Sequence, residues 1–102
     1  MYNISMNKLD FVWDEEKNRK NIKKHSISFE EAATVFYDEA AIVFDDPEHS
    51  IDENRFLIIG VSSTDKLCIV SHCYKEEDGI IRIISARLAV KREKDYYNEQ
   101  FI

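Results

Sequence analysis

The fold is decided by the stretch Ile80-Ile81-Arg82-Ile83-Ile84-Ser85-Ala86-Arg87. Its isoleucines predict a β-strand, because β-branched side chains fit an extended backbone. Arginine keeps its charge at any physiological pH, and its guanidinium offers a fork of donors that fits a phosphate group. Arg82 and Arg87 are therefore candidates for binding an anion from a rigid strand. The alternative is that both are charged residues of an edge strand that prevent aggregation.

The segments on either side of this strand predict the rest of the sheet. Two longer strands precede it, over residues 55–61 and 67–74, and the connectors 62–65 and 76–79 are short and polar, as in hairpins. Short loops between consecutive strands indicate an antiparallel meander. A shorter strand over residues 41–44 comes first and ends at Asp45-Asp46-Pro47. From Leu88 to about Gln100 the pattern becomes helical.

Two helices are predicted before the sheet. Asp14 can cap a helix that ends near Lys24, and Ser28-Phe29-Glu30-Glu31 forms a capping box at the start of a second helix. The first helix is polar, so we expect it to pack shallowly through Trp13 and Ile22. The order of elements is therefore ααββββα. This is an α+β fold with two N-terminal helices, a four-stranded, mainly antiparallel sheet and a C-terminal helix.

Length and composition indicate one domain over residues 1–102. The chain is 44% hydrophobic, with only two Gly and one Pro. Residues 1–10 are expected to be a flexible or edge segment. The longest apolar run, residues 56–61, is far too short to span a membrane, and the first residues lack the features of a signal peptide. We therefore expect a cytoplasmic protein without membrane contact.

Cys68 and Cys73 are expected to be reduced residues of the core. If both lie on the strand 67–74, they point to opposite faces and are about 16 Å apart, which is beyond the reach of a disulfide. Their spacing also differs from that of a zinc site.

The net charge is −6, but the basic residues are concentrated. Ten of the fourteen Lys and Arg residues fall within residues 17–24 and 82–94, whereas residues 26–53 hold nine acids and no Lys or Arg. If folding joins the two basic segments, they would form a basic face that attracts a polyanion such as nucleic acid. The alternative is two solvated helices with ordinary surface lysines.

Several motifs occur in a definite order along the chain. They are Phe11-Val12-Trp13-Asp14-x-x-Lys17, Asn21-x-x-Lys24-His25, Ser28-Phe29-Glu30-Glu31-Ala32, Glu53-x-Arg55, Gly60 and Ile83-Ile84-Ser85-Ala86-Arg87. This ordered set resembles the BrnT family, the ribonuclease toxins of BrnT/BrnA type II toxin–antitoxin pairs. The resemblance extends to about Tyr97. Ser26 departs from it, because the family usually has Gly there, and Val90 stands where Thr is common.

The resemblance implies a RelE-like fold and cleavage of mRNA in the cytosol. It also implies neutralisation by a BrnA-like ribbon-helix-helix antitoxin in a 2:2 heterotetramer. Operator DNA would then be an indirect partner, reached through the antitoxin. No cofactor and no metal ion are expected.

Cleavage of RNA without a metal ion needs three kinds of group. A base takes the 2′-hydroxyl proton, cationic donors stabilise the charge on the phosphorane, and an acid protonates the leaving 5′-oxygen. Arg55, Arg82 and Arg87 are candidates for the cationic role, because strands place such groups accurately.

Arg82 and Arg87 are five residues apart, so in a regular strand they face opposite sides of the sheet. They share a face only if a bulge lies between them, or if Arg87 already belongs to the turn before the last helix. Otherwise only one of the pair touches RNA, and the family pattern then favours Arg87.

His25 is the first candidate for proton transfer, because imidazole titrates near neutral pH and His25 follows the basic helix directly. The alternative is a helix-terminal histidine that caps carbonyl groups. His72 lies in a predicted strand, where a packed or surface histidine is favoured over a catalytic one. His49 is expected to be exposed in a loop. Glu53 could act as a base beside Arg55, although an ion pair explains it as well.

RNA binding is expected to involve Trp13, Lys17, Lys24 and Arg92. Trp13 can stack on a base, a contact worth about 1–3 kcal/mol in single-strand binding, although a sole Trp beside an amphipathic helix is also a core candidate. Lys17 and Lys24 share one face of the predicted helix and would follow phosphates.

Two other functions are alternatives. The acidic loop could bind Mg²⁺ for a metal-dependent nuclease through Asp45, Asp46, Glu48, His49, Asp52 and Glu53, although such a loop is commonly acidic for solubility. A non-catalytic module that binds a partner protein or operator DNA is the second alternative. The favoured hypothesis is a metal-independent endoribonuclease toxin that inhibits translation and is held inactive by its antitoxin.

Overall fold

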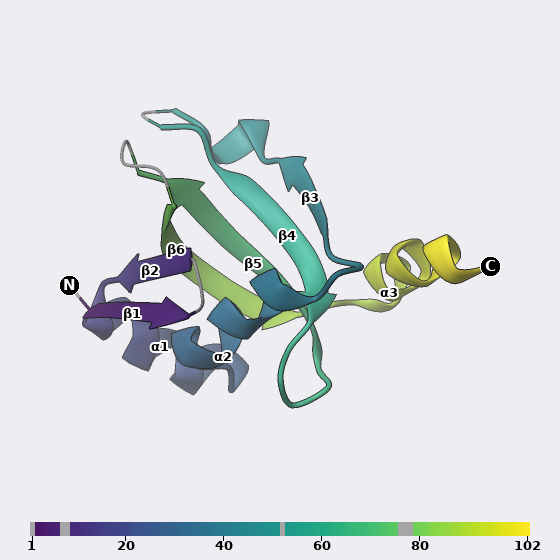
Figure 1. Cartoon of the computed structure of the whole chain (residues 1–102), viewed down its shortest axis with the longest axis horizontal. Coiled ribbons are helices and arrows are strands. Elements are labelled where there is room, and N and C mark those ends of the chain that lie inside the picture. Colours follow the sequence, from purple (N-terminus) through teal and green to yellow (C-terminus); the bar gives the residue numbers. More distant parts are fainter. Residues whose placement is uncertain (1, 7–8, 52, 76–78) are drawn as a thin grey trace.

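The computed structural model describes residues 2–6, 9–51, 53–75 and 79–102 (Figure 1). The strands are β1 (Tyr2–Met6), β2 (Leu9–Trp13), β3 (Ile42–Asp45), β4 (Phe56–Val61), β5 (Leu67–Tyr74) and β6 (Ile80–Leu88). The α-helices are α1 (Glu15–His25), α2 (Phe29–Thr34) and α3 (Lys91–Asn98), with 3₁₀ turns η1 (Val35–Tyr37), η2 (Pro47–His49) and η3 (Glu99–Phe101). None of the described helices is long and apolar enough to cross a membrane.

The strands form one mixed sheet in the order β1-β2-β6-β5-β4-β3. β3 to β6 form an antiparallel meander, as predicted, whereas β2 pairs with β6 in parallel and β1 pairs antiparallel with β2. The predicted order ααββββα is therefore wrong at its beginning, because two of the six described strands precede the helices. Leu9, Phe11 and Trp13 alternate along β2, and a period of two places these large side chains on one face.

Both predicted helix starts are confirmed. The Asp14 carboxylate accepts a hydrogen bond from the Glu16 N–H at 2.9 Å. The Ser28 hydroxyl accepts one from the Glu31 N–H at 3.0 Å. Each cap satisfies a backbone donor that the first helical turn cannot pair internally.

α1 packs through two asparagines, in contrast to the expected contact through Ile22. Ile22 is 43% exposed, whereas Asn18 and Asn21 are buried. Asn18 accepts a hydrogen bond from the Phe29 N–H at 2.8 Å and so ties α1 to α2. Asn21 donates to the Ala86 carbonyl at 2.9 Å and accepts from the Ala86 N–H at 3.0 Å. β2 pairs only with the first part of β6, so no residue of β2 reaches Ala86. The Asn21 side chain makes the backbone hydrogen bonds that a neighbouring strand would make there.

The two departures from the BrnT pattern both lie at helix ends. Ser26 follows α1 with φ 60° and ψ 28°, a left-handed conformation that glycine adopts most easily. Val90 precedes α3, and its side chain makes no capping hydrogen bond. Its N–H donates to the Glu93 carboxylate at 2.9 Å, so Glu93 stabilises this helix start where a threonine hydroxyl could also have done so.

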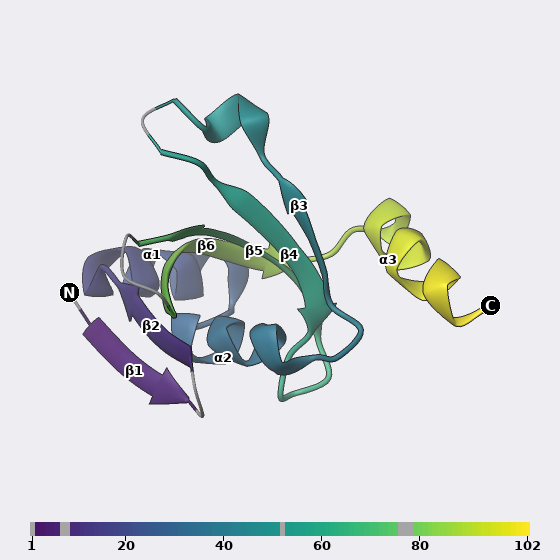
Figure 2. The same cartoon turned by 45° about the horizontal axis from the view of Figure 1, so that its top comes forward.

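The two faces of the sheet bury separate cores. The first face packs against α2 and buries Trp13, Phe29 and Ile83 among other residues. The second face packs against α3 through residues that include Ile59 and Ile69. In Figures 1 and 2, α1 and α2 lie together while α3 stands apart, past the end of β6. α3 therefore covers one end of the second face.

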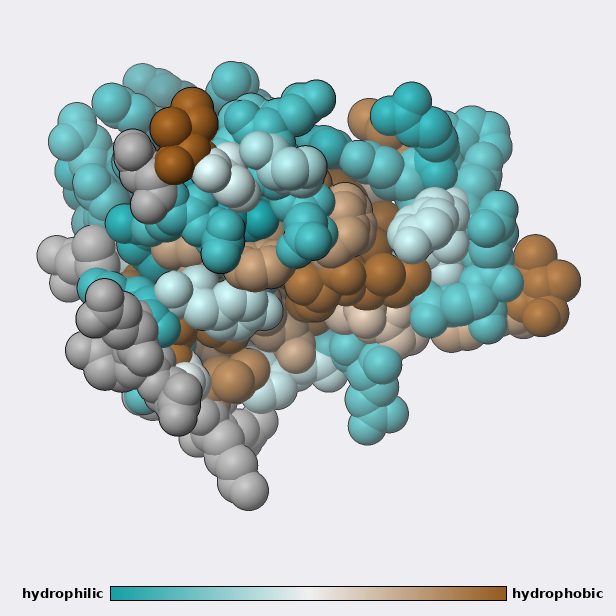
Figure 3. All heavy atoms as spheres, turned by 90° about the horizontal axis from the view of Figure 1, so that it is seen from above, coloured by the Kyte–Doolittle hydropathy of each residue, from teal (hydrophilic) through white to brown (hydrophobic). Residues whose placement is uncertain are grey.

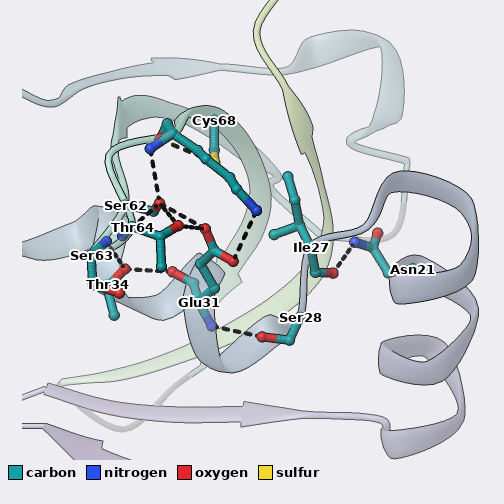
Figure 4. Close-up of polar contacts among 10 residues, drawn as sticks. Asn21, Ile27, Ser28, Glu31, Thr34, Ser62, Ser63, Thr64 and Cys68 are labelled. Atoms are coloured by element: carbon teal, nitrogen blue, oxygen red, sulfur yellow. Dashed lines mark hydrogen bonds and ion pairs between the residues drawn. The ribbon is translucent and has the colours of Figure 1, made fainter.

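Glu31 of α2 holds the turn between β4 and β5 against the helix layer (Figure 4). Its carboxylate accepts hydrogen bonds from the hydroxyls of Ser62 and Thr64, and Lys66 Nζ lies 3.9 Å away. Burial alone would raise the Glu31 pKa, but these hydroxyls and the lysine bring it below its usual value. The glutamate of the predicted capping box thus fixes the turn between β4 and β5 to α2.

Candidate active site

A bulge in β6 places Arg82 and Arg87 on the same face of the sheet. Arg82 lies opposite Cys73 of β5, and Arg87 lies opposite Ile69. Between these pairs the register shifts, and Ile84 has no partner in the described pairing of the two strands. Cys73 and Ile69 are four residues apart, so they and the two arginines belong to the second face. The structure confirms the bulge that the sequence allowed.

Arg55 lies on this second face as well. It precedes Phe56, the first residue of β4, which pairs with His72 on the first face. Adjacent residues of a strand alternate between faces, so Arg55 falls in the row of Cys73 and Arg82.

The arginines of the second face differ in whether a nearby carboxylate neutralises their charge. Glu53 forms an ion pair with Arg82. The neighbouring Cys73 thiol has a raised pKa, mainly because it is buried. Arg55 has no carboxylate partner among the described residues, and no described atom accepts from its buried Nε–H. Four residues of β5, about 13 Å, separate this row from the row of Arg87. The second face thus has two cationic positions, one at Arg55 and Arg82 and one at Arg87.

Arg87 also helps to begin α3. Its two terminal nitrogens donate to the two carboxylate oxygens of Glu93, each at 2.8 Å. These hydrogen bonds raise the pKa of Arg87 and lower that of Glu93. A bidentate pair of this kind fixes the orientation of both side chains.

Tyr97 and Asp38 hold α3 over the sheet. The Tyr97 hydroxyl donates to the Asp38 carboxylate, which also accepts from the Val61 N–H at 2.8 Å and the Ala40 N–H at 2.9 Å. Burial, together with the neighbouring carboxylate, raises the pKa of Tyr97 to about 12. This contact joins α3 to the end of β4.

An apolar hollow lies between α3 and the sheet. Figure 3 shows apolar side chains gathered between α3, at the right, and the rest of the molecule. The rings of Phe44 and Tyr96 meet edge-on there, with 6.5 Å between their centroids. The hollow has a volume of about 500 Å³ and is lined by Phe44, Ile59, Arg92, Glu93 and Tyr96.

The loop between β3 and β4 brings a histidine to the Arg55 end of the face. The Asp46 N–H donates to the Arg55 carbonyl at 3.0 Å. The Ser50 hydroxyl donates to the Asp46 carbonyl at 2.7 Å and accepts from the Arg55 N–H at 2.9 Å. His49 Nδ1 lies 3.0 and 3.1 Å from the two Asp46 carboxylate oxygens. A groove of about 230 Å³ is lined by Glu48, His49, Ile51, Glu53 and Arg55.

The sequence profile of the family described as "Ribonuclease toxin, BrnT, of type II toxin-antitoxin system" matches residues 13–93. The chain belongs to the BrnT family. Its fold is similar to the crystal structure of the Brucella abortus ribonuclease toxin BrnT, with a TM-score of 0.61 and 24% sequence identity. The likeness covers 79% of this chain and 96% of that chain. No match is found among curated proteins.

Membership of the BrnT family confirms the resemblance carried by the ordered motifs. It makes this chain a ribonuclease toxin of a type II toxin–antitoxin system, and it implies an antitoxin partner.

In this BrnT-family chain, three of the predicted site residues lie on α1 rather than on the second face. Lys17 and Lys24 are exposed on that helix, and His25 is its last residue. The His25 side chain is partly buried, and no hydrogen-bond or ion-pair partner for it is found among the described residues. Arg92 lies instead on α3, at the apolar hollow beside Glu93. The structure therefore brings the arginines together but leaves His25 in the helix layer.

Trp13 is wholly buried in the core of this BrnT-family chain. Its indole N–H donates to the Glu15 carboxylate at 3.1 Å, and its ring packs edge-on against Phe29. The prediction that Trp13 stacks on RNA is wrong for the folded chain, because none of its surface is accessible. The core alternative is the correct one.

His72 and the two cysteines are also internal. His72 is completely buried on the first face, and burial lowers its pKa to about 4. Cys68 and Cys73 are free and buried, as predicted, and burial raises the pKa of Cys68 to about 11. None of these three side chains is placed to meet a substrate.

No group of three or more His, Cys, Asp or Glu side chains within the described residues is placed to hold a metal ion. Asp52, one of the acidic residues named for the alternative metal site, lies outside those residues. Glu53 pairs with Arg82 across the sheet rather than with its neighbour Arg55.

Proposed function

We propose that this chain is an endoribonuclease that cleaves RNA on the second face of the sheet without a metal ion, and that it thereby inhibits translation. The observation that carries the proposal is the bulge in β6, which collects Arg82 and Arg87 on the face that Arg55 also occupies. Two cations on β6 and one directly before β4 on the same face suit a chain of phosphates.

Arg55 and Arg82 form the proposed cleavage centre. Arg55 lacks a carboxylate partner among the described residues, so its charge is available for a phosphate. The ion pair of Arg82 with Glu53 is partly exposed, with side-chain exposures of 31% and 40%. Pairs of this kind contribute about 0–1 kcal/mol, so a phosphate can replace Glu53 at small cost. Both guanidinium groups would then stabilise the phosphorane, whose charge exceeds that of the substrate phosphate.

RNA would extend from this centre towards α3. Arg87 and Arg92 supply positive charge along that path, and Tyr96, which is 51% exposed, offers a ring face beside the apolar hollow. Base stacking on an aromatic ring is typical of single-stranded RNA recognition. Lys17 and Lys24 would contact only RNA that reaches the helix layer.

The partner that would neutralise the toxin is proposed to be a BrnA-like ribbon-helix-helix antitoxin, in a 2:2 heterotetramer within the cytoplasm. Family membership supports an antitoxin in general. Operator DNA would be bound through the antitoxin, because the chain itself carries a net charge of −6.

The proposed reaction is tested by incubating purified protein with a defined single-stranded RNA in excess EDTA. We expect the wild type to cleave, because the proposed chemistry uses side chains alone. We expect Arg87→Ala to bind RNA more weakly, and therefore to cleave more slowly below saturation, because it removes a positive charge from the path of the RNA. Cleavage is followed by gel electrophoresis of end-labelled RNA.

Glu93→Gln is the matched control for Arg87→Ala, because it breaks the same ion pair but keeps the arginine. Retained cleavage by Glu93→Gln indicates that Arg87 acts on RNA. Equal losses in both variants would show that Arg87 serves only to begin α3. Cleavage by the wild type that EDTA abolishes would overturn the metal-independent reaction.

A further inference from the structure

We infer that His49, oriented by Asp46, is the base that accepts the 2′-hydroxyl proton during RNA cleavage. This inference rests on the proposed ribonuclease function and assigns a role that the sequence motifs give to His25. Two observations support it: the contact between the imidazole and a carboxylate, and the groove that His49 shares with Arg55.

The contact with Asp46 determines which ring nitrogen of His49 is available. An ionised carboxylate only accepts hydrogen bonds, so the nitrogen that faces it, Nδ1, must carry the proton. Nε2 of a neutral imidazole is then unprotonated and can accept a proton. The side chain of His49 is 62% exposed, whereas that of Asp46 is 15% exposed. The base is therefore open to a substrate while the group that orients it is held by the protein.

The loop fixes this pair beside the cleavage centre. Ser50 bridges the two ends of the loop by bonding both the Asp46 carbonyl and the Arg55 N–H. The Asp46 N–H bonds the Arg55 carbonyl, and the His49 N–H bonds the Asp46 carbonyl at 3.2 Å. Four hydrogen bonds thus connect the histidine backbone to the arginine backbone and fix their relative positions.

The groove offers space for one phosphodiester beside His49 and Arg55. The charged groups that line it besides His49 are Glu48, Glu53 and Arg55. Arg55 lines the groove, and Glu53, which also lines it, forms the ion pair with Arg82. A phosphate bound there would lie between a cation and a base, the arrangement that in-line attack by a 2′-hydroxyl requires.

In the proposed reaction, His49 accepts the proton of the 2′-hydroxyl and water donates a proton to the leaving 5′-oxygen. The 2′-oxygen bonds to phosphorus while its proton moves to Nε2 of His49. The bond between phosphorus and the 5′-oxygen breaks, and the departing oxygen takes a proton from water. The products are a 2′,3′-cyclic phosphate and a 5′-hydroxyl, and the imidazolium gives its proton to the hydroxide that remains.

The other two histidines are less suited to this role. His25 closes α1 in the helix layer and has no orienting partner among the described residues. His72 is fully buried, and its Nδ1 is bonded to the Val70 carbonyl.

The test uses single-turnover cleavage of a short single-stranded RNA in excess EDTA, at saturating protein. We expect His49→Gln to lower the cleavage rate by about 10²–10⁴-fold, the usual contribution of general base catalysis, with little change in RNA affinity. Added imidazole should restore part of the activity of His49→Ala, which a purely structural role would not allow.

Asp46→Asn tests Asp46 as a positioning residue. Removing the carboxylate takes away the acceptor that orients His49 Nδ1, so the rate at saturating protein should fall while RNA affinity is unchanged and some cleavage remains. Wild-type rates in His49→Gln would overturn the inference and leave the ribonuclease function standing, as would loss of cleavage in His25→Gln alone. No cleavage by the wild type would overturn both.

Discussion

Arg55→Ala is expected to lower the rate of RNA cleavage by about 10²–10³-fold, the larger of the arginine effects at the cleavage centre. Of the three arginines on the second face, Arg55 is the one without an ion pair to a described carboxylate, and it lines the groove beside His49. Its loss therefore removes a cation that the remaining residues cannot replace. The rate is measured at saturating RNA, so that weaker binding is not mistaken for slower chemistry.

Arg19→Ala is the matched control, because it removes an exposed arginine from α1, in the helix layer. It should keep the wild-type rate, since the charge lost is the same but the position differs. Equal losses in Arg55→Ala and Arg19→Ala would mean that only the total positive charge matters. That result would contradict a defined cleavage centre on the second face.

Acid is expected to destabilise the fold through His72 by up to about 3 kcal/mol. Burial lowers the His72 pKa from 6.5 to about 4, so between these values the unfolded chain binds more protons than the folded one. The free energy of unfolding is therefore highest above about pH 6.5 and decreases as the pH falls towards 4. Urea unfolding at a series of pH values measures this decrease.

His72→Gln is the comparison that isolates this effect, because glutamine does not titrate but can still donate to the Val70 carbonyl. The variant should show a smaller loss of stability between pH 7 and pH 4 than the wild type. Carboxylates such as Glu31 and Asp38, whose pKa values are lowered in the fold, also lose stabilising interactions in acid, and they do so in both proteins. His72→Phe serves as a second variant that cannot titrate. Parallel pH curves for all three proteins would show that His72 does not control acid stability.

Local sequence signals predicted the elements of this fold that depend on near neighbours. The caps at Asp14 and Ser28 and the strands of the meander all follow from short patterns, and the structure contains them. β1 and β2 were missed because β2 joins the sheet by parallel pairing with β6, about seventy residues further along the chain. Only the alternation of Leu9, Phe11 and Trp13 indicated a strand there.

The packing of α1 was mispredicted for a related reason. The helix has one clear apolar residue, Ile22, yet it buries Asn18 and Asn21. These asparagines satisfy backbone groups of α2 and β6, which are distant in sequence. A sequence pattern identifies apolar side chains that can be buried, but it does not show which backbone groups will need a partner.

The candidate site was predictable in its residue types but not in its geometry. Arg55, Arg82 and Arg87 were named from the sequence, and their common face depended on a bulge at Ile84 that the sequence allowed without requiring. His49 was expected only to be exposed. The spacing of three residues between Asp46 and His49 could have indicated their contact. The position of His49 beside Arg55, however, depends on how the loop closes.

The central claim is that RNA binds on the second face of the sheet, and amide chemical-shift mapping tests it most directly. The probe is a single-stranded RNA made non-cleavable by a 2′-deoxy nucleotide at the scissile position. We predict that the shifted amides cluster at the β3–β4 loop, at Arg55 and along β6 from Arg82 to Arg87, with α1 unaffected. Shifts centred on Lys17 and Lys24 of α1, with none at Arg55 or Arg82, would contradict the claim.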